Sequence, residues 1–231
     1  RWLEFRVCSS DLDLVMDEEL SIINANTRNE KIKNFFLNNK NKIIFGIIIL
    51  VIIVTAVYSY DKYLTNKKKE ISDNYNSIII EYSENSKDET ANKLIEIIGK
   101  KDPTYSPLSL YFIIDNDLVS DKKVVFNLFQ TIINDTSLDK EIKNLVIYKK
   151  ALFYAAEIDD NENDLLDILN PLINSESVWK SHALYLMGEY YFSKNQKQKA
   201  KEFYEKIIAS ENTNLDINKE VQKRLNRDFS E

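Results

Sequence analysis

The amino-acid sequence predicts an all-α protein in which a single membrane-spanning helix near the N-terminus precedes a stack of paired helices. Residues 43–60 hold no charged side chain, although 29% of the 231 residues are charged. Beyond them, apolar residues recur three and four positions apart, which is the spacing of amphipathic helices. The chain has only three Gly and three Pro, too few for the turns of a large sheet.

The first residues differ from the rest of the chain. They read RWLEFRVCSSDL and lack the Asn, Lys and Ile bias of the later residues. We expect residues 1–15 to be a non-native leader and the natural protein to start at Met16; a fragment of a longer gene is the alternative. Without the leader the protein has no cysteine, because Cys8 is the only one. A disulfide, a thiolate metal site and a cysteine nucleophile are then excluded.

Residues 43–60, IIFGIIILVIIVTAVYSY, have the length and composition of a transmembrane helix. Eighteen helical residues cover about 27 Å, close to the hydrocarbon thickness of a bilayer. Twelve of the eighteen are Ile, Leu, Val or Phe, which favours insertion by roughly 5 kcal/mol. The run is too long for a signal peptide and lacks a small-residue cleavage site, so we expect a retained anchor. Tyr58, Tyr60 and Tyr63 suit an interfacial aromatic belt.

The segments that flank the span leave some alternatives open. Basic residues are about as numerous ahead of the span as behind it, so charge hardly decides the orientation. We expect residues 16–42 to be cytoplasmic, because the short leading segment is the easier one to retain. Ile32, Phe35, Phe36 and Leu37 form an apolar cluster between lysines. This cluster is either an amphipathic helix on the inner leaflet or the first turns of one helix that enters the membrane.

Behind the span we expect a juxtamembrane helix or linker over residues 61–70 and a helical domain over residues 71–231. Short joints rich in Asp, Asn, Ser and Lys separate the periodic stretches. Helices of this length joined by short loops favour antiparallel neighbours, as in a closed bundle or a stacked solenoid. The nine predicted helices cover residues 67–83, 88–100, 106–116, 122–134, 140–157, 163–173, 177–193, 197–210 and 218–227.

A spacing match favours the solenoid. The tetratricopeptide repeat has the pattern W-x₂-L-G-x₂-Y followed by A-x₃-F, with small residues where two helices approach closely. The last hairpin shows it with conservative changes at the bulky positions, in Leu184, Met187, Gly188, Tyr191, Ala200 and Tyr204. We expect Gly188 and Ala200 to lie at the close approach of the two helices. Tyr191 and Tyr204 should fill the spaces beside them.

The first hairpin, residues 67–83 and 88–100, repeats part of the pattern. Tyr82, Ala91 and Ile95 have the same mutual spacing, and Pro103 lies where the repeat usually closes. Ile79 stands where Gly is expected. We therefore expect irregular tetratricopeptide-like hairpins whose packing angles differ from those of a regular array.

The residues required for catalysis are missing from this sequence. His182 is the only histidine, and no Ser or Cys in an elbow motif accompanies it. The three glycines are too far apart for a phosphate-binding loop. The acidic runs DEE and NENDLLD lack the spacing of a calcium loop. We expect no enzyme, no cofactor, no metal site and no small-molecule substrate.

The net charge argues against one class of partner. Seven basic and seven acidic residues balance over residues 1–60, so the formal charge of −6 belongs to residues 61–231. An acidic domain is a poor binder of nucleic acid. We therefore expect the partners to be proteins, together with the membrane that holds residues 43–60.

Several stretches together carry a family resemblance. They are the entry FFLNNKNKIIFGIII, the exit YSYDKYLTNKKKE and the hairpin SVWKSHALYLMGEYYFSKNQKQKAKEFYEKII. From residue 16 to about residue 210 the chain resembles the ancillary SecYEG translocon subunit family, whose domain is shared with a cell-division coordinator. Its low Gly and Ala content departs from that family. The resemblance implies a single-pass protein of the bacterial inner membrane with a periplasmic repeat domain.

The resemblance also implies a function in protein binding. We expect an accessory subunit of the Sec translocon that contacts the channel and periplasmic chaperones or emerging chains. The alternative is a structural scaffold that coordinates cell-division or envelope-assembly complexes without binding clients. Candidate side chains for the concave face, each equally suited to the core, are Tyr75, Tyr82, Tyr111, Tyr148, Tyr185 and Tyr190.

Overall fold

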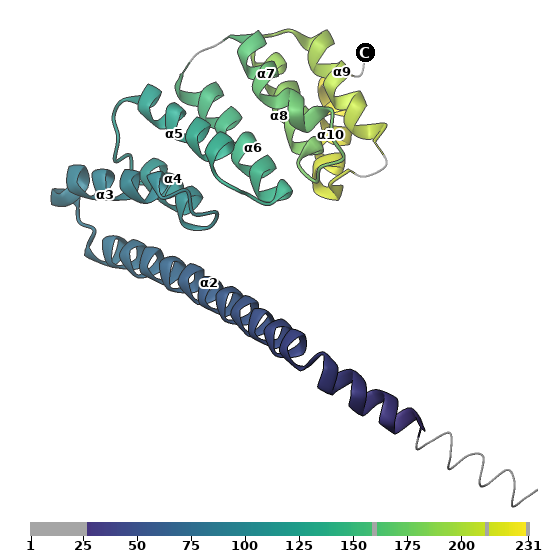
Figure 1. Ribbon diagram of the computed structural model, residues 1–231. Helices are drawn as coiled ribbons and strands as arrows, with labels where there is room; N and C mark the ends of the chain where they lie inside the picture. Colours follow the sequence, from purple (N-terminus) through teal and green to yellow (C-terminus); the bar gives the residue numbers. More distant parts are fainter. Residues whose placement is uncertain (1–26, 159–160, 211–212, 230–231) are drawn as a thin grey trace, which may run out of the picture. The chain divides into compact units, whose positions relative to one another are not determined.

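The structure is a computed structural model that describes residues 27–158, 161–210 and 213–229. Every regular element in these ranges is a helix (Figure 1). The all-α prediction is thus confirmed for the described residues. The expected leader 1–15, Cys8 and the expected start at Met16 lie outside them.

The chain divides into two units, Arg1–Thr65 and Asn66–Glu231, and the 42-residue helix α2, Lys40–Glu81, runs through the boundary. The span, the juxtamembrane segment and the next helix, expected as separate segments, are therefore one helix. The physical reason is composition. Between Gly46 and Gly99 there is no Gly or Pro to interrupt the backbone hydrogen bonds.

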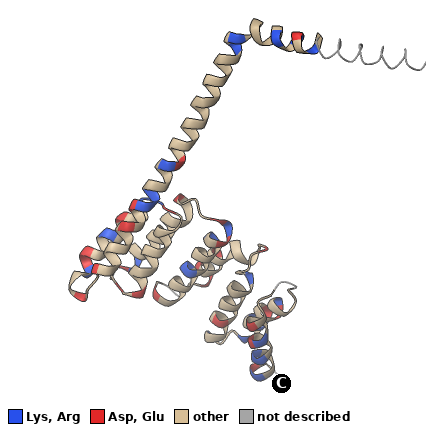
Figure 2. Cartoon of the chain, turned by 90° about the horizontal axis from the view of Figure 1, so that it is seen from below, with Lys and Arg blue, Asp and Glu red and all other residues tan. Residues whose placement is uncertain are grey.

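Within 27–158, 161–210 and 213–229, α2 is the one helix long and apolar enough to cross a membrane. Side chains from residue 44 to residue 70 are all exposed, so the described chain does not cover this apolar surface. Figure 2 shows the stretch as a long uncharged ribbon with basic residues at both ends. The Thr55 hydroxyl donates to the Val51 carbonyl at 2.8 Å, so its polar group is satisfied within the helix.

The second unit continues with a short 3₁₀ helix and eight α-helices. Figure 1 shows helices that are neighbours in the sequence lying side by side. From α3 onward the predicted boundaries agree with the observed ones within three residues, and the largest shifts are at the starts of α8 and α10. The elements are η1 Glu84–Ser86, α3 Lys87–Gly99, α4 Tyr105–Asp115, α5 Lys122–Asp135, α6 Lys140–Glu157, α7 Glu162–Ile173, α8 Lys180–Ser193, α9 Lys197–Ile208 and α10 Leu215–Asp228.

Polar residues cap these helices at both ends, and at several C-termini they take the position that glycine usually occupies. The carboxylate of Asp121 accepts a hydrogen bond from the Lys123 backbone N–H at 2.9 Å, and so begins α5. At helix C-termini, Lys101, Asp117 and Asn195 adopt positive φ values of 55°, 46° and 58°. This left-handed conformation usually belongs to glycine. A chain with three glycines therefore makes its turns with strained non-glycine residues.

The core consists of two clusters that meet at α6. One cluster joins the end of α2 to α3, α4, α5 and one side of α6, including Val146 and Phe153. The other joins the opposite side of α6, including Ala151 and Tyr154, to α7, α8, α9 and α10. Helix α6 thus connects the two halves of the second unit.

The most extensive packing in the second unit is between α8 and α9. The signature residues Leu184, Met187, Gly188, Tyr191, Ala200 and Tyr204 are all buried there. The ring of Tyr204 lies directly over the Cα of Gly188, where a Cβ atom would clash with it. Its hydroxyl donates to Glu189 at 2.6 Å, which fixes the ring in place. Tyr191 in turn donates to Glu162 of α7 at 2.9 Å.

The first expected hairpin is packed differently. Helix α3 makes its most extensive contacts with α4, and the backbones of α2 and α3 do not approach as α8 and α9 do. Ile79, in place of glycine, is half-buried against the core cluster that includes residues of α3 and α4. Ala91 is buried and Ile95 half-buried. Tyr82 follows the end of α2 and contacts the Phe112 ring at 5.3 Å, and Pro103 is exposed in the turn before α4.

Helix α10 closes the second unit although most of its residues are polar. Val221 is fully buried against the α8 and α9 cluster. The Arg224 guanidinium pairs with Glu189, the same carboxylate that accepts the Tyr204 hydroxyl. An ion pair that is partly removed from water and shared with a third group orders its members more than an exposed pair does. Glu189 therefore connects α8, α9 and α10.

We predict that Gly188→Ala destabilises the protein by about 1–2 kcal/mol, because overpacking of the Tyr204 ring outweighs the higher helix propensity of alanine. The matched control is Gly99→Ala in α3, where a Cβ atom meets nothing within 4 Å. Urea unfolding of the detergent-solubilised chain, followed by circular dichroism, measures both. A Gly188→Ala variant as stable as Gly99→Ala would contradict the close approach of α8 and α9.

Candidate functional site

The most apolar hollow described on the second unit lies between α4, α5 and α6, with a volume of about 250 Å³, and is called the α4–α6 groove. Its floor includes Phe129, which is fully buried. At its rim Leu152 is 40% exposed. The lining residues are Tyr111, Ile114, Asp115, Phe129, Lys149, Leu152, Phe153, Ala156 and Glu157. An open apolar floor with a charged rim is the usual form of a surface that binds another protein.

A second hollow of about 400 Å³ adjoins the α4–α6 groove and shares Ile114, Phe153 and Glu157 with it. Lys122 bridges its two sides, since its ammonium lies 2.8 Å from Asp117 and 3.8 Å from Glu157. The hydrogen bond from Lys122 lowers the pKa of the Asp117 carboxyl. The rim is therefore charged at neutral pH, with acids and a lysine in alternation.

Tyr111 and Lys149 form one wall of the α4–α6 groove. The Lys149 ammonium lies 4.8 Å from the centre of the Tyr111 ring, within the range of a cation–π contact. The Tyr111 hydroxyl is buried and has no hydrogen-bond partner among the described residues. Burial raises the pKa of this hydroxyl to about 12, so it stays protonated. Both side chains are thus held against the groove by packing rather than by hydrogen bonds.

The tyrosines expected on a concave face are all half-buried. Five of the six pack against another aromatic ring: Tyr75 with Tyr105, Tyr82 with Phe112, Tyr148 with Trp179, Tyr185 with Tyr204 and Tyr190 with Tyr191. Ring pairs of this kind contribute to the core beyond their buried area. Tyr111 lines the α4–α6 groove.

His182 lies in an aromatic cluster near the start of α8. Its ring centre is 5.0 Å from that of Trp179 and 5.7 Å from that of Tyr148. Burial lowers the pKa of the imidazole, and a contact with the Val178 carbonyl offsets this in part. The ring is therefore neutral at pH 7 and serves as an apolar surface for its neighbours.

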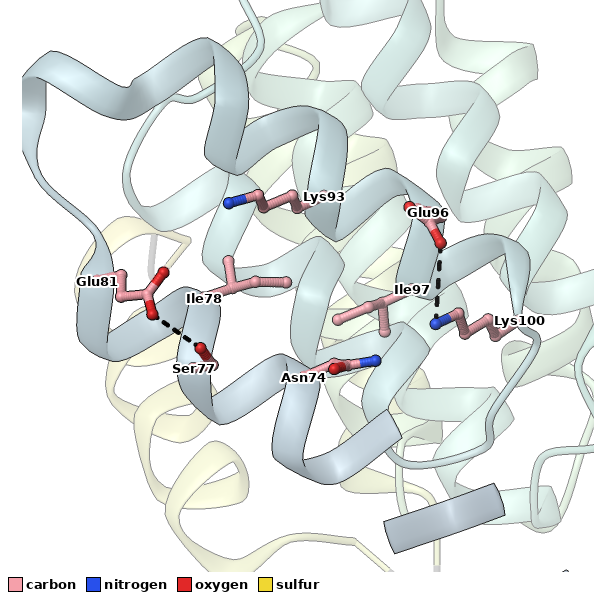
Figure 3. A pocket seen from close by; sticks show the side chains of 8 residues that line it. All are labelled: Asn74, Ser77, Ile78, Glu81, Lys93, Glu96, Ile97 and Lys100. Carbon is pink, nitrogen blue, oxygen red and sulfur yellow. Dashed lines mark hydrogen bonds and ion pairs between the residues drawn. The ribbon is translucent and has the colours of Figure 1, made fainter. Parts of the chain in front are cut away.

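A further groove of about 260 Å³ lies between the end of α2 and α3 (Figure 3). Its lining is mostly polar. The Ser77 hydroxyl donates to Glu81 at 3.0 Å, and Lys100 lies 3.8 Å from Glu96. Because these groups pair within each wall of the groove, the groove offers a partner less unsatisfied or apolar surface than the α4–α6 groove does.

Among the residues that the structure describes, no three His, Cys, Asp or Glu side chains are close enough to hold a metal ion. The expected signature residues of α8 and α9 form core contacts, and the α4–α6 groove is formed by other residues. No protein-family model, no curated protein and no solved structure matches this chain.

Sequence reasoning missed Lys149, Leu152 and Ala156 as surface residues. The available signal was the composition of the last turns of α6, ALFYAA, which is apolar around the whole helix circumference. A helix with apolar residues on every side must be covered on every side or leave apolar surface exposed. Which of these holds depends on the neighbouring helices, and their positions do not follow from the spacing.

We predict that the protein loses thermal stability when the pH falls from about 7.5 to about 5.5. The folded-state pKa of His182 lies below its ordinary value of 6.5, so the unfolded chain binds more protons in this window. The stability is present above pH 6.5 and is lost as the pH falls towards the folded-state pKa. Thermal unfolding at several pH values measures the effect.

The control is His182→Phe, which keeps a ring beside Trp179 and Tyr148 but cannot be protonated. We expect this variant to lose most of the pH dependence in the window. The lowered pKa values of Asp117 and Glu162 place these carboxyls in their charged form throughout it. An unchanged pH dependence in the variant would exclude His182 as its source.

Proposed function

We propose that this protein is a membrane-tethered module that binds other proteins through the α4–α6 groove. The observation that carries the proposal is the groove itself, an open apolar hollow with a charged rim in the second unit. Helix α2 also carries an apolar stretch long enough to cross a membrane. Exposed apolar side chains in a hollow favour association with a protein surface. The proposal assigns binding, and no reaction, to this site.

The hairpin α8 and α9 supports the proposal that the second unit is a solenoid of irregular tetratricopeptide-like repeats. Its close approach at Gly188 and the burial of its signature residues are the features that the repeat pattern requires. Helices that contact mainly their sequence neighbours are typical of solenoids, which use an extended surface for binding. The irregular first hairpin, with Ile79 in place of glycine, is consistent with a divergent array.

The resemblance to ancillary SecYEG translocon subunits narrows the proposed partners to translocon subunits, periplasmic chaperones or emerging chains. In this proposal residues 43–60 cross the bacterial inner membrane with the N-terminus in the cytoplasm and the helical unit in the periplasm. A tether of this kind raises the local concentration of the groove at the membrane face, so weak contacts suffice for capture. Segments with an apolar side chain flanked by charges of both signs match the groove and its rim.

We predict that a photoreactive amino acid at Ala156 in the α4–α6 groove cross-links to translocon subunits, periplasmic chaperones or exported chains in bacterial cells. The same amino acid at Val124, on α5, serves as the matched control, because both positions are exposed and Val124 does not line the groove. Mass spectrometry of the purified adducts identifies the partners. Leu152→Glu should abolish the adducts, because it replaces an exposed apolar side chain of the groove with a charged one.

The outcomes separate the parts of the proposal. Equal adducts at Ala156 and Val124 would show that the groove is not the binding site. Adducts from Ala156 with only cell-division or envelope-assembly proteins would reject the translocon partner. The paired substitution Val124→Glu controls for stability, because Val124 is 39% exposed and Leu152 is 40% exposed.

A further inference from the structure

Residues 27–38 form a helix that ends before α2 begins. Figure 1 draws it as a separate coil, and Asn39 forms a turn between it and Lys40. The Phe35 carbonyl accepts both the backbone N–H and the side-chain amide of Asn39, each at 3.0 Å. A side chain that competes for a helical carbonyl is a usual cause of a local break in a helix. The expected alternative of one uninterrupted helix entering the membrane therefore does not hold for the described backbone.

This helix has one apolar face. With 100° between successive residues, Ile32, Phe35 and Phe36 project to the same side. They are 46%, 60% and 55% exposed, so the described chain leaves them uncovered. Asn34 and Asn38 project to the other side together with Leu37, which is 61% exposed, while Arg28 lies one turn before Ile32 on the apolar side. Lys31 and Lys33 lie at the two borders between these faces.

The charge of the segment favours an anionic surface. Residues 27–42 contain five basic side chains and a single acidic one, Glu30, for a formal charge of +4. The basic residues are Arg28, Lys31, Lys33, Lys40 and Lys42. A helix with bulky apolar residues on one face and lysines at its borders is the usual form of an interfacial membrane helix. Its lysines attract anionic lipid headgroups, at roughly 1 kcal/mol for each lysine near the surface.

Because residues 27–38 lie next to the apolar span in the chain, a lipid bilayer is the surface expected to cover their apolar face. The uncharged run starts at residue 43, only five residues after the helix ends. When α2 is in a bilayer, the chain itself holds residues 27–38 at the boundary between headgroups and acyl chains. A lipid surface is therefore within reach of Phe35 and Phe36 without any further partner.

We propose that residues 27–38 lie flat on the anionic lipid surface on the side where the N-terminal end of the span emerges, with Asn39 as the joint. The apolar face enters the acyl boundary, and the lysines at its borders contact lipid phosphates. This proposal requires that α2 is inserted in the bilayer. It does not depend on the binding function of the α4–α6 groove.

The test places a nitroxide spin label at single cysteines introduced into the full chain, with Cys8 changed to Ser. The labelled positions are Ile32, Phe35 and Phe36 on the apolar face and Asn34 and Asn38 on the polar face. The chain is reconstituted in vesicles of phosphatidylcholine with or without phosphatidylglycerol. Collision with oxygen, which is enriched in lipid, is compared with collision with a water-soluble nickel complex. A label at Val51 in the span reports whether α2 has inserted.

We expect oxygen to dominate at positions 32, 35 and 36, and the nickel complex to dominate at positions 34 and 38. Nickel access at all five positions, with Val51 still in lipid, would overturn the proposal, because the helix would then be in water. A steady increase in depth from position 32 to position 38 would also overturn it, because the helix would then continue straight into the bilayer.

The preference of residues 27–38 for anionic lipid is tested by a separate comparison. The double substitution Lys31→Gln and Lys33→Gln keeps the apolar face and removes two charges. We expect phosphatidylglycerol to deepen labels 32 and 36 in the parent chain and to do so at most weakly in the double variant. Equal depths with and without phosphatidylglycerol in the parent chain would reject an anionic surface as the occupant.

Discussion

The constraint on which the structure depends is the need to cover the apolar side chains of residues 43–60. All but the first of them are exposed. Helical backbone satisfies its own hydrogen bonds, which is the condition for a single segment to exist in hydrocarbon. The same helix continues beyond the apolar stretch until Ile71 reaches the core of the second unit. The apolar segment and the folded unit are thus joined by backbone that has no break.

The second unit is built with very little glycine, and this decides where its helices approach closely. Among its described helices, Gly188 is the one glycine packed beneath a neighbouring ring. There the Tyr204 ring fills the space that a side chain would occupy, and Glu189 holds its hydroxyl. At the opposite end the backbones of α2 and α3 do not approach closely, and the space between them remains an open groove. Of these two helix pairs, the one with a glycine beneath a ring is the more closely packed.

Much of the fold could be predicted from the sequence, because helix boundaries depend on local signals. The apolar spacing and the polar joints placed α5, α6 and α9 nearly as the structure has them. The continuity of α2 was harder to see, since a lysine-rich stretch is typical of both linkers and helices. The absence of Gly and Pro over residues 47–98 was the deciding feature. The pairing of α3 with α4 rather than with α2 depends on how side chains of several helices pack together, and the repeat spacing alone does not determine this.

The candidate site could not be predicted because it depends on which face of α6 stays uncovered. At 100° per residue, Ala151 and Tyr154 face one core cluster and Val146 and Phe153 face the other. Leu152 and Ala156 project to a third side, where no further helix in the described chain covers them.

Because α6 is held on two sides by separate clusters, the apolar surface on its third side is not needed for the stability of the fold. Apolar residues at such a position can contribute to binding without a role in stability, since substitution there removes little core packing. The comparison of Leu152→Glu with Val124→Glu uses this separation: if α6 is anchored as the two clusters indicate, both variants fold, and a difference in captured partners reports on the groove alone.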